Sequence, residues 1–160
     1  MSCRQMGRLG FEEGIGHRQE LAELPAAYRA WRTSILGRVT DALEHDLIVH
    51  LIGPPAGLRI LDVGCGDAAL AVDLSKRGGT VTGVDASPEM IEAGRQRALQ
   101  QGEHVTLDVA KVQALPFAAD TFDAVVAVTV LCFVEDAGAA LREMARVLRP
   151  RRPACHRRTG

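Results

Sequence analysis

Short apolar segments alternate with helical segments along most of this chain, and this alternation constrains its fold more than any other feature. The first apolar segment, 58–63, runs into glycines, and a helical segment follows at 68–76. Strands that alternate with helices are typical of a parallel sheet with helices on both faces. Segments as apolar as these fit strands that are buried on both sides. We expect the further strands at 80–84, 104–109 and 122–131 and the further helices at 87–101 and 136–148.

A longer helix is predicted before this region, because apolar residues recur there at every fourth position and would share one helical face. These residues are Ile35, Val39, Leu43, Leu47 and Leu51. Gly53, Pro54 and Pro55 follow and would end the helix. An earlier helix is expected at 17–31. A length of 160 residues suggests one domain. We therefore predict an N-terminal tail at 1–25, an α/β domain at 26–150 and a basic tail at 151–160.

The composition is that of a globular protein, with 47% apolar and 24% charged residues, which excludes collagen and a disordered chain. The longest apolar run, 124–134, is shorter than the ~20 residues of a membrane span. The first residues lack the apolar stretch of a signal peptide. The four cysteines show no CxxC spacing, which favours reduced thiols in the cytoplasm over disulfides or a zinc site.

The net charge of −1 conceals an uneven distribution of charged residues. Residues 149–160 contain five arginines and no acid, so residues 1–148 hold 14 basic and 20 acidic residues. An acidic body is a poor nucleic-acid surface, because phosphate contacts need Lys and Arg. A nucleic-acid-binding module that uses the arginine-rich tail stays open as an alternative, but the acidic body argues against it.

A glycine turn after the first strand and an acid at the end of the second strand carry the functional signal. Gly64 and Gly66 would let the backbone approach a ligand closely where the strand turns into a helix. Asp85 ends the second strand 21 residues after Gly64, near the spacing of a ribose-binding acid. Together these residues predict a nucleoside cofactor at the carboxyl ends of adjacent strands.

Two kinds of nucleoside cofactor fit this turn. Gly64, Gly66 and Ala69 also satisfy the dinucleotide fingerprint, so an NAD(P)-dependent oxidoreductase stays an alternative. Asp62, two residues before the first glycine, argues against it, because a carboxylate there would repel a pyrophosphate. The same carboxylate would suit a cofactor that carries an ammonium group.

Five motifs follow one another along the chain: Leu-Asp-Val-Gly-Cys-Gly (61–66), Gly-Val-Asp-Ala-Ser-Pro-Glu-Met (83–90), Ala-Leu-Pro-Phe (114–117), Phe-Asp-Ala-Val-Val (122–126) and Arg-Val-Leu-Arg-Pro (146–150). Through these motifs the segment from about Tyr28 to Leu148 resembles the class I S-adenosylmethionine-dependent methyltransferases, in the small-molecule group that includes quinone C-methyltransferases. The resemblance implies a Rossmann-like, doubly wound parallel sheet and methyl transfer from S-adenosylmethionine to a small molecule. It implies neither a nucleic-acid partner nor a membrane, and it does not identify the methyl acceptor or the oligomeric state.

The resemblance implies cofactor-binding residues but names no catalytic residue and no metal ligand. The glycine turn would pack against the methionine part of the cofactor, and Asp62 would orient its ammonium group. Asp85 would bind the ribose, while Ala86 and Met90 would flank the adenine. The complete expected set is Asp62, Gly64, Cys65, Gly66, Asp85, Ala86, Met90, Val112 and Thr129.

Three positions depart from the family pattern. Asp67-Ala68 stands where relatives often have Thr-Gly, and Ala68 would cost little if its φ were negative. Lys111 replaces an Asp that contacts the adenine amino group, so Asp108 or the backbone near Val112 would have to hold the adenine. Cys132 replaces a His found in many relatives.

Residues 151–160 do not resemble the Gly-Gly and fifth strand that follow in the family. Read one base later from codon 150, the possible codons permit Pro-Gly-Gly-Arg-Leu-Val-Ile-Gly-Glu-Leu, the expected continuation. We hypothesise that a single-base frameshift displaced this end, and genomic resequencing that found no displaced frame would refute it. The fourth strand would then be a sheet edge, and a non-catalytic fragment that binds a nucleoside or nothing is the alternative to an active methyltransferase.

Overall fold

The computed structural model describes residues 34–150, which fall into two compact units divided between Pro54 and Pro55. In the first unit, helix α3 (Ile35–Ile52) begins at Ser34, whose Oγ accepts a hydrogen bond from the Gly37 amide at 3.0 Å, and ends at Gly53. This confirms the helix predicted from the apolar period. No helix in 34–150 combines the length and apolar character needed to cross a bilayer. The expected tails at 1–25 and 151–160 and helix at 17–31 lie outside the described residues.

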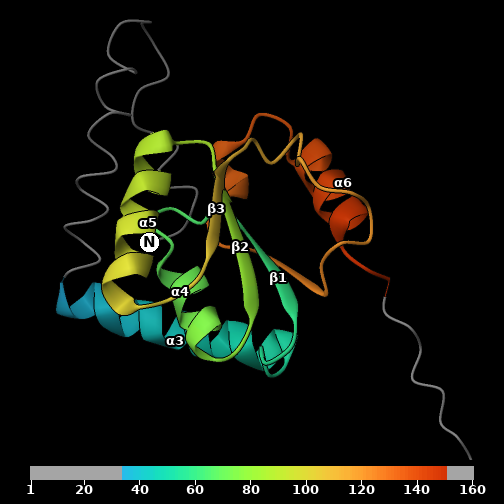
Figure 1. Cartoon of the computed structure of the whole chain (residues 1–160). Coiled ribbons are helices and arrows are strands. Elements are labelled where there is room, and N and C mark those ends of the chain that lie inside the picture. The colour runs from blue at the N-terminus through green and yellow to red at the C-terminus, as the bar shows by residue number, and fades with distance from the viewer. Residues whose placement is uncertain (1–33, 151–160) are drawn as a thin grey trace, which may run out of the picture. The chain divides into compact units, whose positions relative to one another are not determined.

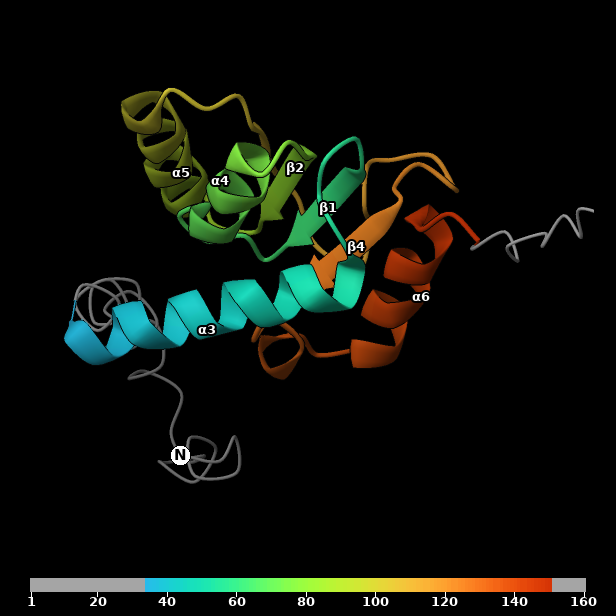
Figure 2. The same cartoon turned by 90° about the horizontal axis from the view of Figure 1, so that it is seen from below.

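The second unit is a parallel four-stranded sheet with helices on both sides, and it confirms the predicted α/β, Rossmann-like fold class. The strand order is β3-β2-β1-β4. Figure 1 shows α4 and α5 on one side of the sheet and α6 on the other, and Figure 2 shows the same arrangement from below. The elements are β1 (Arg59–Val63), α4 (Ala69–Lys76), β2 (Thr80–Asp85), α5 (Pro88–Gln101), β3 (Thr106–Val109), β4 (Ala124–Ala127), the 3₁₀ turn η1 (Leu131–Phe133) and α6 (Ala137–Val147).

The helix boundaries in this unit follow from capping residues that the sequence shows. Ser87 precedes α5, and its Oγ accepts from the Met90 amide at 3.2 Å. Gly102 ends that helix with a φ of 69°, a conformation that glycine adopts without strain. Asp136 caps α6 in the same way, accepting from the Ala139 amide at 2.8 Å. The Ser87 and Asp136 side chains each satisfy an amide at the start of a helix that would otherwise lack a partner.

One hydrophobic core lies between the sheet and α6. Alternate residues of β1 point to this side, because successive side chains of a strand face opposite ways. The residues from β1 and β2 are almost inaccessible to solvent, and they pack with residues from α6 and from the segment between β3 and β4. The buried members are Leu61, Val63, Val84, Val112, Leu115, Phe122, Ala140 and Val147.

Strand β4 is shorter than the sequence predicts. The apolar run suggests a strand over 122–131, but the regular strand ends at Ala127. Ala127 pairs with Val63, the last residue of β1, so the neighbouring strand offers no further partner. Thr129 then has a φ of 59°, which turns the chain out of the extended conformation. In this run only Phe122, Ala124 and Val126 are buried, and Thr129 is exposed, so the apolar composition indicated neither the extent of burial nor the end of the strand.

Candidate functional site

The carboxyl ends of the strands meet at one edge of the sheet, because all strand pairs are parallel. Val63 at the end of β1 pairs with Val84 on one side and with Ala127 on the other. The chain passes from β1 to β2 and β3 in one direction and to β4 in the other, so the topology reverses at β1. Open α/β sheets bind their ligands at such a switch point. The predicted site residues at 62–66 and 85 lie there.

The glycine turn between β1 and α4 needs glycine at two positions for two reasons. Gly64 has a φ of 70°, and a Cβ built on it would lie 2.3 Å from Cγ2 of Val130. Gly66 has a φ of 54°, but a Cβ on it would meet no atom of the described residues within 4 Å. The amides of Gly64 and Cys65 both donate to the Val84 carbonyl, at 2.7 and 3.0 Å. The turn is therefore held against β2, while Gly66 borders open space.

Asp85 connects the glycine turn to the end of β2. Its Oδ2 accepts from the Gly66 amide and its Oδ1 accepts from the Ser87 amide, both at 2.9 Å. A carboxylate oxygen can accept more than one hydrogen bond, so both oxygens can still accept bonds from a ligand. The two contacts fix the carboxylate beside the space at Gly66.

Three carboxylates surround the thiol of Cys65. Burial raises the pKa of this thiol, and the negative charges of Asp62, Asp85 and Asp67 raise it further. Asp62 and Asp67 are only 2% and 8% exposed. Cys65 is thus held as a neutral thiol, which is a weak nucleophile. The negative potential of this group favours a cation over an anion in the adjoining space.

Ala68 does not have the negative φ with which an alanine would cost little stability at this position. Its φ is 58°, in the left-handed region, and it is fully buried. The Cβ of an L-residue in that conformation crowds the following carbonyl oxygen. The position thus retains the backbone shape of a glycine while carrying a methyl group. Asp67, the preceding residue, forms an ion pair with Arg97 of α5.

The residues expected around the adenine lie on two segments. Ala86 is exposed and Met90 is half-buried, at the start of α5. Val112 is only 6% exposed and belongs to the hydrophobic core, so its side chain is covered by the chain itself. Lys111 is exposed, and so is Asp108 on β3. The Ala110 amide donates to the Asp85 carbonyl at 3.0 Å, which ties this segment to β2.

The segment after β4 reaches the glycine turn from the other side. Val130 contacts Gly64 closely, and it packs against the hydrophobic core. Thr129, the preceding residue, is exposed, and its carbonyl accepts a hydrogen bond from the Cys132 thiol at 3.0 Å. Of this segment, Val130 rather than Thr129 is the residue that touches the turn.

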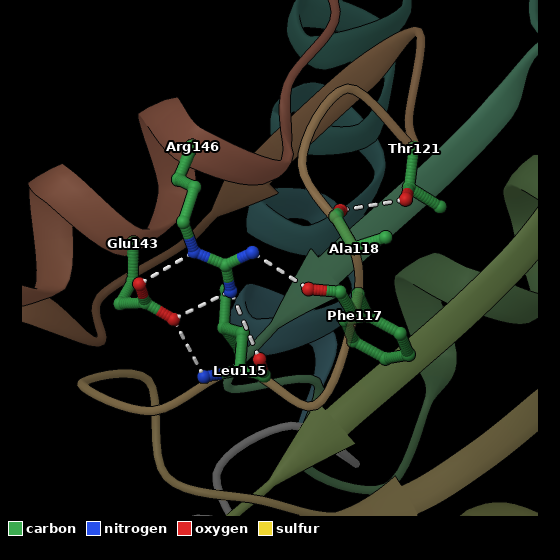
Figure 3. A network of polar contacts seen from close by, with 6 residues as sticks. All are labelled: Leu115, Phe117, Ala118, Thr121, Glu143 and Arg146. Carbon is green, nitrogen blue, oxygen red and sulfur yellow. Dashed lines mark hydrogen bonds and ion pairs between the residues drawn. The ribbon is translucent and has the colours of Figure 1, made fainter.

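A polar network holds the turn at 115–117 against α6 (Figure 3). Arg146 donates to the carbonyls of Leu115 and Phe117 at 3.0 and 2.7 Å, and to the Glu143 carboxylate at 2.7 and 2.8 Å. Glu143 also accepts from the Leu115 amide at 2.9 Å. Its hydrogen bonds from Arg146 and then from this amide lower its pKa to about 2. The Leu-Pro-Phe motif and the arginine of the last motif are thus parts of one contact.

Sequence reasoning missed three residues that shape this region: Val130, Arg97 and Glu143. Val130 and Arg97 act on residues far away in the sequence, so no local pattern indicates their contacts. Glu143 was detectable in principle, because it lies three residues before Arg146 on a predicted helix, where opposite charges interact.

Comparisons with known proteins place the chain among methyltransferases. Residues 61–151 match the family model described as a methyltransferase domain. The chain is 40% identical over 116 residues to methyltransferase GfsG of Streptomyces halstedii, covering 71% of this chain and 40% of that protein. It is 32% identical over 140 residues to a ubiquinone biosynthesis O-methyltransferase of Alkalilimnicola ehrlichii, covering 84% of this chain and 56% of that protein.

A solved structure gives the same result at the level of the fold. The S-adenosylmethionine-dependent methyltransferase of Mesorhizobium loti superposes with a TM-score of 0.58 at 27% identity, over 66% of this chain and 48% of that one. The chain spans 40% of the length of GfsG and 56% of that of the Alkalilimnicola ehrlichii enzyme. It spans 38% of an uncharacterised protein of Mycobacterium tuberculosis that is also similar to it. Since the family model covers more than half of the sequence, the chain belongs to the class I S-adenosylmethionine-dependent methyltransferases.

Proposed function

We propose that this chain binds S-adenosylmethionine at the carboxyl ends of β1 and β2 and takes part in transferring its methyl group to a small-molecule acceptor. The observation that carries the proposal is the position of Asp85, whose two oxygens are fixed by the Gly66 and Ser87 amides at 2.9 Å. This carboxylate faces a turn that leaves space beside Gly66. When bound, the cofactor supplies a sulfonium, from which a methyl group can leave.

The residues present fit this cofactor in charge as well as in shape. Asp62 and Asp85 supply most of the negative charge around Cys65, because the charge of Asp67 is offset by its ion pair with Arg97. A sulfonium and an ammonium group gain from such a potential, whereas the pyrophosphate of NAD(P) would be repelled by it. Arg97, the basic side chain that contacts the turn, is already paired with Asp67. The charges therefore favour S-adenosylmethionine over a dinucleotide.

We assign the parts of the site as the resemblance implies. Asp62 would orient the ammonium group, Asp85 would accept hydrogen bonds from the ribose, and Ala86 and Met90 would flank the adenine. The full proposed set keeps Gly64, Cys65, Gly66, Val112 and Thr129 as well. Catalysis would rest mainly on holding the acceptor, the methyl group and the sulfur in line, an effect of orientation.

Calorimetric titration with S-adenosylhomocysteine, the demethylated product, tests the proposed binding. We expect saturable binding by the chain, loss of that binding in Asp85→Ala, and no binding of NAD. Asp73→Ala is the matched control, because Asp73 forms an exposed pair with Arg77 within and just after α4. A folded chain that binds NAD in preference, or that binds the product equally well after Asp85→Ala, would overturn the proposal.

A turnover assay separates an enzyme from a fragment that only binds. Release of S-adenosylhomocysteine from S-adenosylmethionine would be measured across a panel of small acceptors. Turnover that depends on an acceptor supports methyl transfer by this chain. Binding without turnover across the panel would favour the alternative of a non-catalytic fragment.

We also propose that the chain acts in the cytoplasm and without a nucleic-acid partner. Residues 1–148 hold 20 acidic and 14 basic residues, which disfavours contacts to phosphates. Cys65 and Cys132 form no disulfide, as in a reducing compartment. An electrophoretic shift of DNA or RNA that weakens as salt is raised would contradict the proposed absence of a nucleic-acid partner.

A further inference from the structure

Hydrogen bonds hold the glycine turn to α5 as well as to β2. Arg97 Nε donates to the carbonyl oxygen of Asp67 at 2.9 Å, and its terminal Nη2 pairs with the Asp67 carboxylate. One guanidinium thus holds both the backbone and the side chain of the residue next to Gly66. We propose that Arg97, acting through Asp67, is a positioning residue that fixes the glycine turn for the cofactor. This inference rests on the proposed function.

The hydrogen bond of Gly66 to Asp85 explains how the contacts of Arg97 would affect the binding site. The amide of Gly66 donates to Asp85 Oδ2 at 2.9 Å, while the next residue along the chain is held by Arg97. The turn is therefore fixed on both sides of Gly66, once from β2 and once from α5. Releasing the α5 side leaves the turn held from β2 alone, through the amides of Gly64, Cys65 and Gly66. The position of the Asp85 carboxylate would then be less well defined.

The packing of α5 supports the same conclusion independently. Gly94 lies one helical turn before Arg97 and on the same face of α5. A Cβ built on Gly94 would stand 2.9 Å from the Cβ of Ala68 and 3.4 Å from the carbonyl carbon of Asp67. The helix therefore approaches the turn closely because residue 94 has no side chain. This close approach brings the Arg97 guanidinium within reach of the turn.

The burial of the carboxylate distinguishes this pair from an ordinary surface ion pair. The Asp67 side chain is 11% exposed and that of Asp73 is 29% exposed, whereas the two arginines, Arg97 and Arg77, are similar at 35% and 38%. A buried carboxylate that loses its cation costs far more than an exposed one, since water does not replace the lost partner.

The test compares Arg97→Gln with the control Arg77→Gln in two measurements. The first is the dissociation constant for S-adenosylhomocysteine, and the second is hydrogen exchange of the Gly66 amide without ligand. We expect Arg97→Gln to weaken binding about tenfold, the effect of losing one partner of a buried charge. We also expect the Gly66 amide to exchange faster in that variant, while the control matches the native chain in both measurements.

Two further variants show whether Arg97 acts through Asp67. Arg97→Lys keeps the positive charge but cannot bind the carbonyl and the carboxylate of Asp67 together. The Gly66 amide should therefore exchange faster in this variant than in the native chain, and more slowly than in Arg97→Gln. If Arg97→Gln does not fold, Arg97→Lys takes its place in both measurements. With Asp67→Thr already present, Arg97→Gln should weaken binding less than it does alone. An equal loss in both backgrounds would show that Arg97 acts independently of Asp67.

The outcomes also separate this inference from the proposed function. If the native chain bound no S-adenosylhomocysteine, the proposed function would fail, and exchange of the Gly66 amide alone would decide whether Arg97 fixes the turn. Variants that lowered the melting temperature but left both the affinity and the Gly66 exchange rate unchanged would show a merely structural role. That result would overturn the inference.

Discussion

At the scale of single residues, Ala68 combines two opposing contributions to stability. Its left-handed backbone, with a φ of 58°, costs about 1–2 kcal/mol for an L-residue. Its methyl group is fully buried, which contributes about 0.8 kcal/mol, and alanine also limits the freedom of the unfolded chain by about 0.4–1 kcal/mol relative to glycine. These contributions nearly cancel. The alanine can thus stand at a position whose backbone conformation suits glycine.

We therefore predict that Ala68→Gly changes the free energy of unfolding by less than about 0.5 kcal/mol, because the relief of strain offsets the lost methyl group. Ala71 is the matched control, since it is equally buried but lies inside α4. Ala71→Gly should cost about 2 kcal/mol, from lost helix propensity and lost burial together. Urea unfolding of both variants checks this, and equal losses at the two positions would disprove the strain at Ala68.

The two cysteines of the described residues should differ in reactivity. The Cys65 thiol is buried among carboxylates, which raise its pKa, whereas Cys132 is exposed after β4. Only the thiolate reacts with an alkylating agent, and each unit of raised pKa lowers its amount tenfold. We predict that iodoacetamide modifies Cys132 at least about tenfold faster than Cys65 in the native chain. Mass spectrometry of the labelled peptides measures both rates, and comparable rates would mean that the site is open or unfolded.

At the scale of elements, the contact between α6 and the turn at 115–117 depends on the ionised form of Glu143. Arg146 and the Leu115 amide lower the pKa of Glu143 from 4.5 to about 2. A carboxyl whose pKa falls on folding stabilises the fold fully above its unfolded pKa, and this contribution is lost as the pH drops towards the folded value. The contact should thus be complete at neutral pH and weaken between about pH 4.5 and 2.

We predict that Glu143→Gln lowers the melting temperature at neutral pH and that this difference shrinks as the pH is lowered through that range. The reason is that acid protonates the native Glu143 and removes the same charge. Glu92→Gln is the control, because Glu92 pairs with Arg95 at 3.8 Å on an exposed part of α5. Melting curves recorded across the range provide the measurement. A difference that stays constant with pH would show that the charge of Glu143 contributes nothing.

Local sequence patterns predicted the elements and part of the site, and tertiary contacts decided the rest. Gly64, Gly66 and Asp85 could be placed together, because parallel strands bring residues at their carboxyl ends to one edge. The end of β4 at Ala127 could not be predicted, since it depends on the length of β1 beside it. The hydrogen bonds between Arg97 and Asp67 join residues that are 30 apart in the sequence, and no local pattern indicates such a pair.

At the scale of the whole molecule, the order in which the strands pair produces the site. Strands β2 and β3 lie on one side of β1 and β4 lies on the other, so the segments that leave their carboxyl ends diverge around the glycine turn. One segment brings Asp85 and α5, and the other brings Val130 against Gly64. The candidate site therefore depends on the topology of the sheet, which brings together three separate parts of the sequence.

Hydrogen exchange with and without S-adenosylhomocysteine tests the central claim most directly, because it shows where the cofactor binds as well as whether it binds. We predict slower exchange in three segments, 63–67, 85–90 and 110–112, and unchanged exchange at the amino ends of β1 and β4. Protection confined to other parts of the chain, or no protection in a folded chain at saturating ligand, would contradict a cofactor site at the carboxyl ends of β1 and β2.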